Sequence, residues 1–375
     1  MKYITDLSSD DLRSKRVLVR AGLDVPLDKD GAVADLFRVK QASKTLRFLK
    51  EAGAKTIILS HIGRDPKETN APVAAALKAE IDLYYISDVL GTAARDSIAS
   101  MKEGDTVLLE NLRRDEREVA NDDEFARELA SLGDLYVDDA FSVAHRAHAS
   151  IIGVPKYLPS FAGILMREEV DMLAKARAPE HPSFSILGGA KFETKSPLIR
   201  VLLENYDHLF ICGALVNDVF KARGCEVGVS TVSAELPDEG ILNHPHFMAP
   251  TDVTVEHADK QAMVKKPQEV GADERIVDIG PDSISLIAPF IVSAKFVLWN
   301  GPTGLYEDGF ISYTHAIADL ISKSGAHAVI GGGDTIAAIE NSGITFGSNV
   351  FLSTGGGAML EYLLNGTLPG IDALN

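Results

Sequence analysis

The amino-acid sequence predicts an α/β protein with two doubly wound parallel sheets of the Rossmann-like kind. Short runs rich in Val, Ile and Leu alternate with helical patterns, and this alternation occurs in two successive halves. The runs are continuously apolar, which is typical of strands in a parallel sheet covered by helices on both faces. The length of 375 residues exceeds what one hydrophobic core usually supports, so two domains are expected.

The first half contains four predicted strands, over residues 16–20, 55–59, 106–109 and 135–137. Helical patterns lie between or after them, over residues 38–50, 71–79, 92–101 and 122–132. In the first helix Val39, Leu46 and Leu49 fall on one face, as expected of a helix packed on a sheet. A segment with glycine and prolines, residues 151–160, precedes a helical pattern over 162–176 that we interpret as the interdomain connector.

The second half repeats this arrangement. Its predicted strands cover residues 184–187, 208–211, 253–255, 296–298, 328–330 and 350–352, and its predicted helices include 195–204, 283–293, 314–322 and 358–364. We therefore expect an N-terminal domain over residues 1–158, a connecting helix or hinge over 159–178 and a C-terminal domain over 179–365. The pattern alone does not place the C-terminal tail.

The composition excludes several classes of function. The formal net charge of −17 at pH 7 opposes binding to nucleic acid or to an anionic membrane. No apolar stretch reaches membrane-spanning length, and residues 1–9 lack the basic and apolar regions of a secretory signal. Only Cys212 and Cys225 are present, without metal-ligand spacing. We therefore expect a reducing cytoplasm, with Cys212 packed in a core.

Three strand-like runs in the second half end in glycines, over residues 185–191, 328–335 and 350–357. Glycine allows the backbone to approach a ligand closely. Helical patterns follow the second and third runs, and the free N–H groups at the start of a helix favour an anion. Several such turns in one half of the chain predict a binding site for a polyphosphate.

Cationic side chains follow the predicted strands of the first half. The group comprises Arg20, Arg38, His61, Arg64, Arg113, Arg146 and His148. Ligands bind beyond the carboxyl ends of parallel strands, and guanidinium groups pair with carboxylate and phosphate oxygens. One such arginine would be interpreted as a solvated or ion-paired side chain, but their recurrence after four strands predicts a site for a small phosphorylated acid. We interpret His145 and His148 as structural groups.

One aspartate and two lysines indicate phosphate chemistry in the second half. Asp334 follows three glycines at a predicted helix start, so it is an N-cap, a Mg²⁺ ligand beside a nucleotide, or both. Lys191 and Lys195 lie four residues apart on one helical face, behind a glycine turn. Exposed lysines ordinarily serve solubility, but two at this place would offer mobile charges to a phosphoryl group in transfer.

The segment around Trp299 predicts contacts to a nucleoside. Trp299 itself is expected in the core, whereas Asn300 and Pro302 follow a strand and offer amide and apolar contacts to a base and sugar. Glu307 is either a ribose ligand or an exposed loop residue. The chain lacks the GxxxxGK[ST] of Walker-type NTPases, a GxGxxG after the first strand, and the HRD and DFG pair of protein kinases.

Nine segments resemble the motifs of the phosphoglycerate kinase family, in the family's order and over nearly the whole chain. They are SHIGR (60–64), LLENLR (108–113), DDAFSVAHRAH (138–148), LGGAKFETK (187–195), DIGP (278–281), WNGPTGLYE (299–307), IGGGDT (330–335), STGGGA (353–358) and LPGIDAL (368–374). The resemblance implies a bilobal kinase with two doubly wound domains joined by a hinge. It also implies that the tail, residues 366–375, packs back on the N-terminal domain.

The resemblance further implies which residues bind each substrate. The phosphoglycerate would be bound by Gly22, Leu23, Asp24, Arg38, His61, Ile62, Gly63, Arg64, Arg113 and Arg146. Mg-ADP or Mg-ATP would be bound by Lys195, Gly213, Asn300, Pro302, Glu307, Gly332, Gly333, Asp334 and Thr335, with Gly355, Gly356 and Gly357 as a phosphate cradle and Asp334 as the Mg²⁺ ligand. Arg38, Lys191 and Lys195 would stabilise the phosphoryl group during transfer.

The first strand-end loop departs from the family pattern. The family usually has an aspartate and an asparagine where this chain has Gly22 and Asp24. An acid at Asp24 would repel an anionic substrate unless it is hydrogen-bonded or offset by a neighbouring arginine, and it would take over the hydroxyl contact of the missing aspartate. We predict retained activity with altered affinity, and a lower KM for 3-phosphoglycerate in the Gly22→Asp, Asp24→Asn double variant.

Together these features predict reversible transfer of a phosphoryl group between 1,3-bisphosphoglycerate and ADP, a reaction of glycolysis and gluconeogenesis. The acceptor carboxylate, with a pKa of about 3.5–4, is ionised at pH 7 and needs no general base. Catalysis would rest on positioning and charge neutralisation after hinge closure. Two alternatives stay open: a non-catalytic nucleotide- or metabolite-binding protein on the same scaffold, and a phosphotransferase for a related carboxylic acid. We expect a cytoplasmic monomer.

Overall fold

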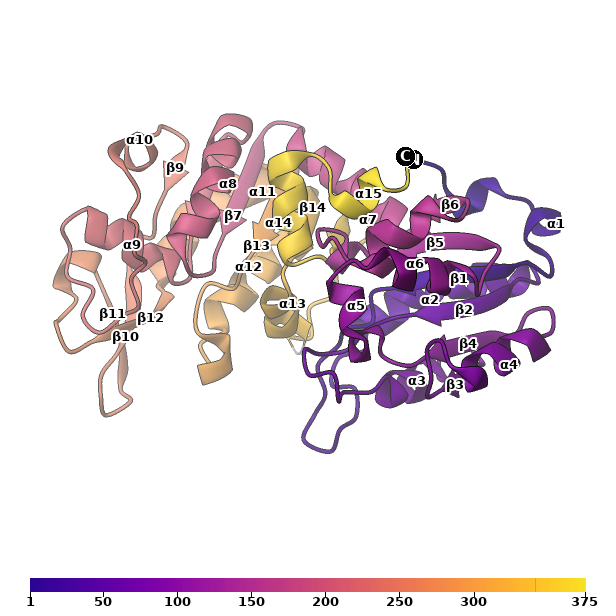
Figure 1. The fold of residues 1–375 in the computed structure, drawn as a ribbon. Coiled ribbons are helices and arrows are strands. Elements are labelled where there is room, and N and C mark those ends of the chain that lie inside the picture. The colour runs from indigo at the N-terminus through magenta and orange to yellow at the C-terminus, as the bar shows by residue number, and fades with distance from the viewer. Residues whose placement is uncertain (341) are drawn as a thin grey trace. The chain divides into compact units, whose positions relative to one another are not determined.

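The computed structural model describes residues 1–340 and 342–375 of the chain. These residues form two compact units, Met1–Asp171 together with Thr367–Asn375, and Met172–Gly366. Each unit contains a parallel sheet with helices packed alongside it (Figure 1). The chain passes from the first unit to the second within helix α7 (Ile164–Arg177), inside the segment that we predicted as the connector.

The first unit has a six-stranded parallel sheet in the order β3-β4-β2-β1-β5-β6. Its strands are β1 (Arg16–Ala21), β2 (Lys55–Leu59), β3 (Tyr84–Ile86), β4 (Thr106–Leu109), β5 (Leu135–Asp139) and β6 (Ser160–Ala162). Its helices besides α7 are α1 (Ser9–Leu12), α2 (Phe37–Glu51), α3 (Ala71–Leu77), α4 (Thr92–Ser100), α5 (Glu116–Val119), α6 (Asp123–Ala130) and α15 (Pro369–Asp372). The four predicted strands are confirmed. The edge strands β3 and β6 were missed because each has only three residues, too few to form a pattern.

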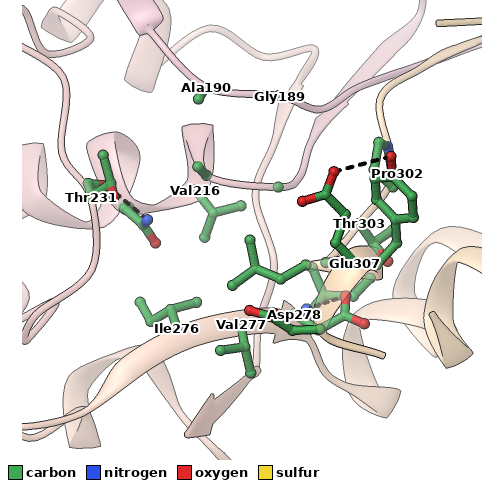
Figure 2. A pocket seen from close by; sticks show the side chains of 18 of the residues that line it. Gly189, Ala190, Val216, Thr231, Ile276, Val277, Asp278, Pro302, Thr303 and Glu307 are labelled. Carbon is green, nitrogen blue, oxygen red and sulfur yellow. Dashed lines mark hydrogen bonds between the residues drawn. The ribbon is translucent and has the colours of Figure 1, made fainter. Parts of the chain in front are cut away.

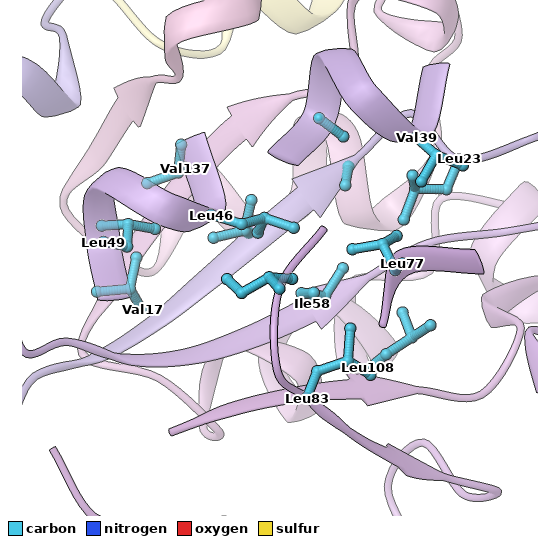
Figure 3. Close-up of a cluster of buried hydrophobic side chains, with 14 of the residues drawn as sticks. Val17, Leu23, Val39, Leu46, Leu49, Ile58, Leu77, Leu83, Leu108 and Val137 are labelled. Atoms are coloured by element: carbon cyan, nitrogen blue, oxygen red, sulfur yellow. The ribbon is translucent and has the colours of Figure 1, made fainter. Parts of the chain in front are cut away.

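The core of the first unit lies between helix α2 and the sheet. Val39, Leu46 and Leu49 of α2 are buried, which confirms the predicted apolar face. Figure 3 shows these side chains grouped with Val17 and Ile58 of the central strands. This packing fixes the first turn of α2, which carries Arg38, above the carboxyl ends of the strands.

The last residues of the chain belong to the first unit. The Gly370 N–H donates to the carbonyl oxygen of Ala144 at 2.8 Å, and Ile371 and Leu374 are buried. Helix α15 therefore contacts the region that follows β5 by both a hydrogen bond and apolar packing.

The second unit has a six-stranded parallel sheet in the order β15-β14-β13-β7-β8-β9 and a separate three-stranded sheet in the order β11-β10-β12. The parallel strands are β7 (Ser183–Leu187), β8 (His208–Ile211), β9 (Phe247–Met248), β13 (Phe296–Asn300), β14 (His327–Gly331) and β15 (Val350–Leu352). The other strands are β10 (Val253–Glu256), β11 (Ala262–Lys265) and β12 (Arg275–Ile279). The helices are α8 (Phe192–Asn205), α9 (Leu215–Ala222), α10 (Glu239–Leu242), α11 (Pro281–Ser293), α12 (Ser312–Lys323), α13 (Gly333–Glu340) and α14 (Gly357–Asn365).

Our assignment of residues 253–255 to the repeated parallel arrangement is wrong. Strand β10 exists there, but it pairs antiparallel with both β11 and β12. An apolar run identifies a strand, whereas its sheet and direction depend on partners that lie elsewhere in the sequence.

In each unit the strand order reverses beside the first strand. The reversal lies between β1 and β5 in the first unit and between β7 and β13 in the second. Ligands of doubly wound sheets bind beyond the carboxyl ends of the strands at such a reversal. The predicted site residues that follow these four strands therefore occupy the expected edge of their own sheet.

Trp299 and Cys212 lie fully buried in the core of the second unit, as predicted. The Trp299 Nε1–H donates to the carbonyl oxygen of Gly301 at 2.8 Å, which ties β13 to the loop that follows it. Burial raises the pKa of the Cys212 thiol, so this residue is not a nucleophile at neutral pH. Within residues 1–340 and 342–375, no helix combines the length and apolar character needed to cross a membrane.

Candidate functional site

Arginine side chains contact the loops that follow β1 and β2 in the first unit. Arg38 Nη1 donates to the backbone carbonyl oxygen of Asp24, after β1, and Arg113 Nη1 donates to that of Gly63, after β2. Arg64 and Arg146 are exposed in the loops that follow β2 and β5. We call the surface formed by Asp24, Arg38, Gly63, Arg64, Arg113 and Arg146 the arginine surface.

The Asp24 carboxylate accepts one hydrogen bond at this surface and lies near one imidazole. Its Oδ1 accepts from the Gly63 N–H at 2.9 Å, and its Oδ2 lies 3.5 Å from Nε2 of His61. Burial alone would raise the pKa of Asp24, but His61, the Gly63 N–H and Arg38 outweigh burial and lower this pKa to about 2. Asp24 is therefore ionised at neutral pH, with a hydrogen bond from Gly63 and the charge of Arg38 nearby, as an acid at this position requires.

His61 lies beneath Asp24, and only 1% of its surface is exposed. Its Nδ1 is 2.8 Å from Nη2 of Arg20. Burial lowers the pKa of His61 to about 4, opposed by Asp24 and aided by the charges of Arg20 and Arg113. The imidazole is therefore neutral at pH 7 and adds no cation to the arginine surface.

Besides His61, the predicted residues Arg20, Leu23 and Ile62 have buried side chains. Arg20 is fully buried, because its side chain leaves the central strand β1 toward the interior. Leu23 and Ile62 are core residues, so only their backbone groups are available to a ligand. His148 is also buried, with Nδ1 3.9 Å from Oε1 of Glu118, which agrees with its interpretation as a structural group.

The arginine surface contains four arginines and one aspartate. Burial lowers the pKa of Arg113. The charges of Arg146 and Arg20 lower it further, whereas those of Asp24 and Glu118 raise it. Cations held close together gain from binding an anion. This local excess explains how a chain with a net charge of −17 can still attract one.

Gly22 provides space for a neighbouring hydroxyl group. A Cβ atom at Gly22 would lie 2.9 Å from Oγ of Ser142 and 3.5 Å from Cα of Ala140. Ser142 would therefore have to change its side-chain rotamer before an aspartate could occupy position 22.

The second unit contains a cavity of about 340 Å³. Figure 2 shows its walls, formed by Val216 and Thr231, by Ile276, Val277 and Asp278, and by Pro302, Thr303 and Glu307. Gly213, Pro302, Glu307 and Asp334 line it, and all four belong to the predicted nucleotide site. The size and the mixed apolar and polar lining suit a nucleoside.

Glycines allow the loops at one end of this cavity to meet. Leu187, Asn300 and Gly331 lie in register at the ends of β7, β13 and β14. The Gly188 N–H donates to the carbonyl oxygen of Asn300 at 2.7 Å. Gly301 has a φ of +96°, and a Cβ there would lie 2.6 Å from the Gly188 backbone, so no other residue fits this approach.

Two predicted nucleotide contacts support these loops instead of lining the cavity. Thr335 is fully buried, and its Oγ1 accepts from the Gly301 N–H at 2.8 Å. Asn300 is 6% exposed, and its amide nitrogen lies 3.1 Å from the position of a Cβ on Gly332. The Thr335 side chain thus holds one loop against another, and the Asn300 amide lies beside Gly332.

Two helices of this unit begin in the predicted glycine runs. Gly333 is the first residue of α13, and Gly356 is the N-cap of α14. Gly356 and Gly357 are accessible, whereas Gly355 is buried. Backbone N–H groups in the first turn of a helix have no intrahelical acceptor, so both starts offer donors to phosphate oxygens.

Asp334 lies inside the first turn of α13, so its predicted role as an N-cap is wrong. The residue is exposed and lines the cavity, and the Tyr306 hydroxyl donates to its Oδ1 at 3.2 Å. The same hydroxyl lies 3.5 Å from Oε1 of the exposed Glu307. Tyr306, which we did not predict as a site residue, thus connects the two acids.

The two predicted lysines flank the turn after β7. Lys191 is exposed and is the N-cap of α8, with a φ of +64°. Lys195 lies one turn into α8, where its Cε is 3.2 Å from the position of a Cβ on Gly189. Burial lowers the pKa of Lys195. Since Gly189 lines the cavity, the Lys195 ammonium group lies close to the cavity wall.

Asp278 is a cavity residue that sequence reasoning missed. It is 5% exposed, and burial, opposed by hydrogen bonds from Thr303 and the Ile279 N–H, raises its pKa to about 7. The signal was available, because the segment RIVDI reads as a strand whose carboxyl end carries the aspartate.

The chain is similar to phosphoglycerate kinases along nearly its whole length. A family model described as phosphoglycerate kinase matches residues 4–366. A phosphoglycerate kinase of Dictyoglomus turgidum is 40% identical over 393 residues, covering 100% of this chain and 98% of the relative. Phosphoglycerate kinase 1, chloroplastic, of Arabidopsis thaliana is 41% identical over 398 residues, covering 100% of this chain and 82% of the relative.

A solved structure supports the same assignment. The crystal structure of phosphoglycerate kinase from Pyrococcus horikoshii OT3 has a TM-score of 0.89 and 29% sequence identity, and the match covers 100% of this chain and 98% of that one. The nine sequence motifs therefore indicated the correct family. Because one relative is named chloroplastic, the cytoplasmic location stays a prediction. Because the phosphoglycerate kinase model matches nearly the whole length of the chain, the chain belongs to the phosphoglycerate kinase family.

Proposed function

We propose that the chain catalyses reversible transfer of the acyl phosphate of 1,3-bisphosphoglycerate to ADP, giving 3-phosphoglycerate and ATP. The observation that carries the proposal is the arginine surface, where Arg38, Arg113 and Arg146 collect positive charge in a strongly acidic chain. Membership of the phosphoglycerate kinase family supports the same reaction.

The first unit would bind the small acid. Arg38, Arg64, Arg113 and Arg146 have guanidinium groups that suit carboxylate and phosphate oxygens. Asp24 would accept a hydrogen bond from the hydroxyl group of the substrate, since it is ionised and cannot donate one. The backbones of Gly22, Leu23 and Ile62 complete the loops around it.

The second unit would bind the nucleotide. The cavity beside Gly213 and Pro302 would hold base and ribose, with Glu307 accepting from the ribose hydroxyl groups. Phosphate oxygens would accept hydrogen bonds from the backbone N–H groups of residues 332–335 and 355–357. The Lys195 ammonium group would also donate to them.

Mg²⁺ fits the second unit. Among the described residues, no group of three or more His, Cys, Asp or Glu side chains could hold a metal alone. Asp334 presents one exposed carboxylate at a helix start, and Mg²⁺ in proteins commonly uses one or two carboxylates together with substrate phosphates. Bound there with the nucleotide, Mg²⁺ would neutralise charge on the phosphate oxygens.

Phosphoryl transfer from ATP needs no proton acceptor. A carboxylate oxygen of 3-phosphoglycerate forms a bond to the γ-phosphorus, the bond from that phosphorus to the β–γ bridging oxygen breaks, and ADP leaves. Arg38, Lys191 and Lys195 would neutralise the charge on the transferred group. The two substrates are assigned to different units. Transfer therefore requires the substrates to come together, as predicted for a hinged enzyme.

A coupled assay with 3-phosphoglycerate, Mg²⁺ and ATP tests the proposal. Turnover that depends on all three supports it. Nucleotide binding without turnover would instead support a non-catalytic binding protein, and turnover with a related carboxylic acid but not with 3-phosphoglycerate would indicate another phosphotransferase. Size-exclusion chromatography with light scattering tests the predicted monomer.

A further inference from the structure

The backbone of Lys191 is held in an uncommon conformation by its neighbours. Its φ of 64° and ψ of 81° lie in the left-handed region, which residues other than glycine rarely adopt. The Lys191 carbonyl oxygen accepts from the Thr194 N–H at 3.2 Å and from the Thr194 hydroxyl at 2.9 Å. The next N–H along the chain, that of Phe192, donates to Oγ of Ser233 at 2.8 Å. Both polar groups of the peptide bond between Lys191 and Phe192 are thus bonded, which fixes ψ of the lysine.

Ser233 is in turn held by an acid of helix α9. Its N–H donates to Oδ1 of Asp218 at 2.7 Å, and its hydroxyl donates to Oδ2 at 2.9 Å. Because the single hydroxyl proton is used on the carboxylate, the lone pairs of Ser233 Oγ stay available to the Phe192 N–H. The first N–H of α9 donates to the carbonyl oxygen of Gly189 at 2.9 Å. Helix α9 therefore secures the chain on both sides of Lys191.

Stability alone does not explain the Asp218 carboxylate. The residue is 1% exposed, and within residues 1–340 and 342–375 no ion pair involves it. Burial raises the pKa of Asp218, the two hydrogen bonds from Ser233 oppose this rise, and the charge of Glu193 adds to it. A buried carboxylate without a cation costs folding free energy. Its contact with the serine that holds the lysine backbone indicates a role in positioning.

We propose that Asp218 and Ser233 are positioning residues that hold Lys191 in its left-handed conformation and thereby direct its ammonium group toward the phosphoryl group in transfer. This inference rests on the proposed function of the second unit. Neither residue touches substrate in this scheme, because the Asp218 side chain is buried and the Ser233 hydroxyl is already bonded to two partners.

The backbone conformation decides in which direction the lysine side chain starts. The direction of the Cα–Cβ bond follows from φ and ψ, and a strained conformation persists only where neighbouring contacts hold it. Without the Ser233 acceptor, the Phe192 N–H would be unpaired in a buried place, since Phe192 is 4% exposed. The peptide group would then gain by rotating toward water, and Lys191 would leave its left-handed conformation.

Amide hydrogen exchange of Phe192, followed by NMR, tests the contact independently of activity. Ser233→Ala removes the acceptor, so exchange of the Phe192 N–H should accelerate about tenfold or more. Ser233→Thr retains the hydroxyl, so exchange should stay within about threefold of wild type. The Gly188 N–H, which donates to the carbonyl oxygen of Asn300 at 2.7 Å, is the internal control and should not change. Unchanged exchange at Phe192 in Ser233→Ala would overturn the proposal.

Steady-state kinetics of the same variants tests the effect on phosphoryl transfer. We expect Ser233→Ala to lower kcat about tenfold, with KM for ATP and for 3-phosphoglycerate within about threefold of wild type, because Lys191 would act on the group in transfer. Ser233→Thr should restore kcat to within about threefold. The matched control is Ser230→Ala, which removes an acceptor from the Ile276 N–H at 2.8 Å and should leave kcat within about threefold. Equal losses of kcat in both alanine variants would indicate general loosening and contradict the proposal.

A double-mutant cycle with Lys191→Ala tests whether Ser233 acts through the lysine. Once the ammonium group is gone, the backbone conformation at position 191 no longer matters for charge neutralisation. In the Lys191→Ala background, Ser233→Ala should therefore lower kcat by less than about twofold. A full tenfold loss in that background would show that Ser233 acts by another route and would refute the positioning role.

Asp218→Asn tests the acid of the pair. Both partners of Asp218 on Ser233 are donors, so an amide that presents N–H₂ to one of them loses or reverses one hydrogen bond. Exchange of the Phe192 N–H should rise and kcat should fall, as in Ser233→Ala, and wild-type values would remove Asp218 from the scheme. Absence of turnover in the wild-type protein would refute the proposed function and this role with it. Turnover with an unchanged kcat in Ser233→Ala would refute the positioning role alone.

Discussion

Replacing Asp138 by Asn should make the first unit more stable at alkaline pH. The Asp138 side chain is fully buried, its Oδ1 accepts from the Ala140 N–H at 2.9 Å, and its Oδ2 has no hydrogen-bond partner among the described residues. Burial, opposed by the Ala140 N–H and the charge of Arg20, raises the pKa of Asp138 from 3.8 to about 7. Between these two pH values the folded state binds more protons than the unfolded state, so stability falls as pH rises.

The structure gives the size of the effect. A shift of roughly three pKa units corresponds to about 4 kcal/mol of lost stability above pH 7. Asn at this position does not ionise, but its N–H₂ group occupies the place where Oδ2 has no partner, which costs about 1–3 kcal/mol. We therefore expect Asp138→Asn to gain about 2 kcal/mol near pH 8.5 and almost nothing near pH 5, where wild-type Asp138 is protonated in the folded state.

Urea-induced unfolding, followed by circular dichroism at several pH values, measures this difference. Amide hydrogen exchange of peptides that cover β5 assigns the change to the first unit. The control is Asp134→Asn, because the hydrogen bond from Arg16 lowers the pKa of this partly exposed acid. Ionised Asp134 stabilises the folded state above the pKa that this residue has in the unfolded chain, and the stabilisation is lost as pH falls. Asp134→Asn should therefore lose stability near pH 8.5, by about 1 kcal/mol or less. Equal changes for Asp138→Asn at both pH values would refute the reasoning.

Three further predictions concern the first turn of α2 and the loops that follow β1 and β13. Arg38→Ala should lower kcat by about 100-fold or more while the Kd for ADP changes less than about threefold. Steady-state kinetics measures kcat, and calorimetry measures the Kd. An unchanged kcat would remove Arg38 from the reacting centre. Asp24→Asn alone should raise KM for 3-phosphoglycerate, whereas adding Gly22→Asp should lower it below the wild-type value; a double variant whose KM stays level or rises would argue against the hydroxyl contact. Gly301→Ala should destabilise the second unit by more than about 3 kcal/mol in urea unfolding, because the new Cβ would meet backbone atoms. The control Gly309→Ala has a similar φ but open space around its Cβ, so it should cost about 1 kcal/mol. Similar costs for the two variants would contradict the contact at Gly301.

The sequence by itself determined the fold class, the family and the positions of most loops that carry the site. Continuous apolar runs show where buried strands lie, since burial on both faces leaves no polar positions. The Val39, Leu46 and Leu49 spacing correctly gave the buried face of α2. Residues that follow such strands were therefore placed at the correct edge of each sheet without coordinates.

Only the tertiary structure decided which of those residues face a ligand. Arg20 and Arg38 read alike in sequence, yet one is buried beneath His61 and the other contacts the Asp24 loop. Likewise Thr335 holds a loop in place while the neighbouring Asp334 lines the cavity. A local pattern records a residue's own polarity, whereas side-chain direction and burial depend on partners over a hundred residues away, such as Ser150 for Arg20.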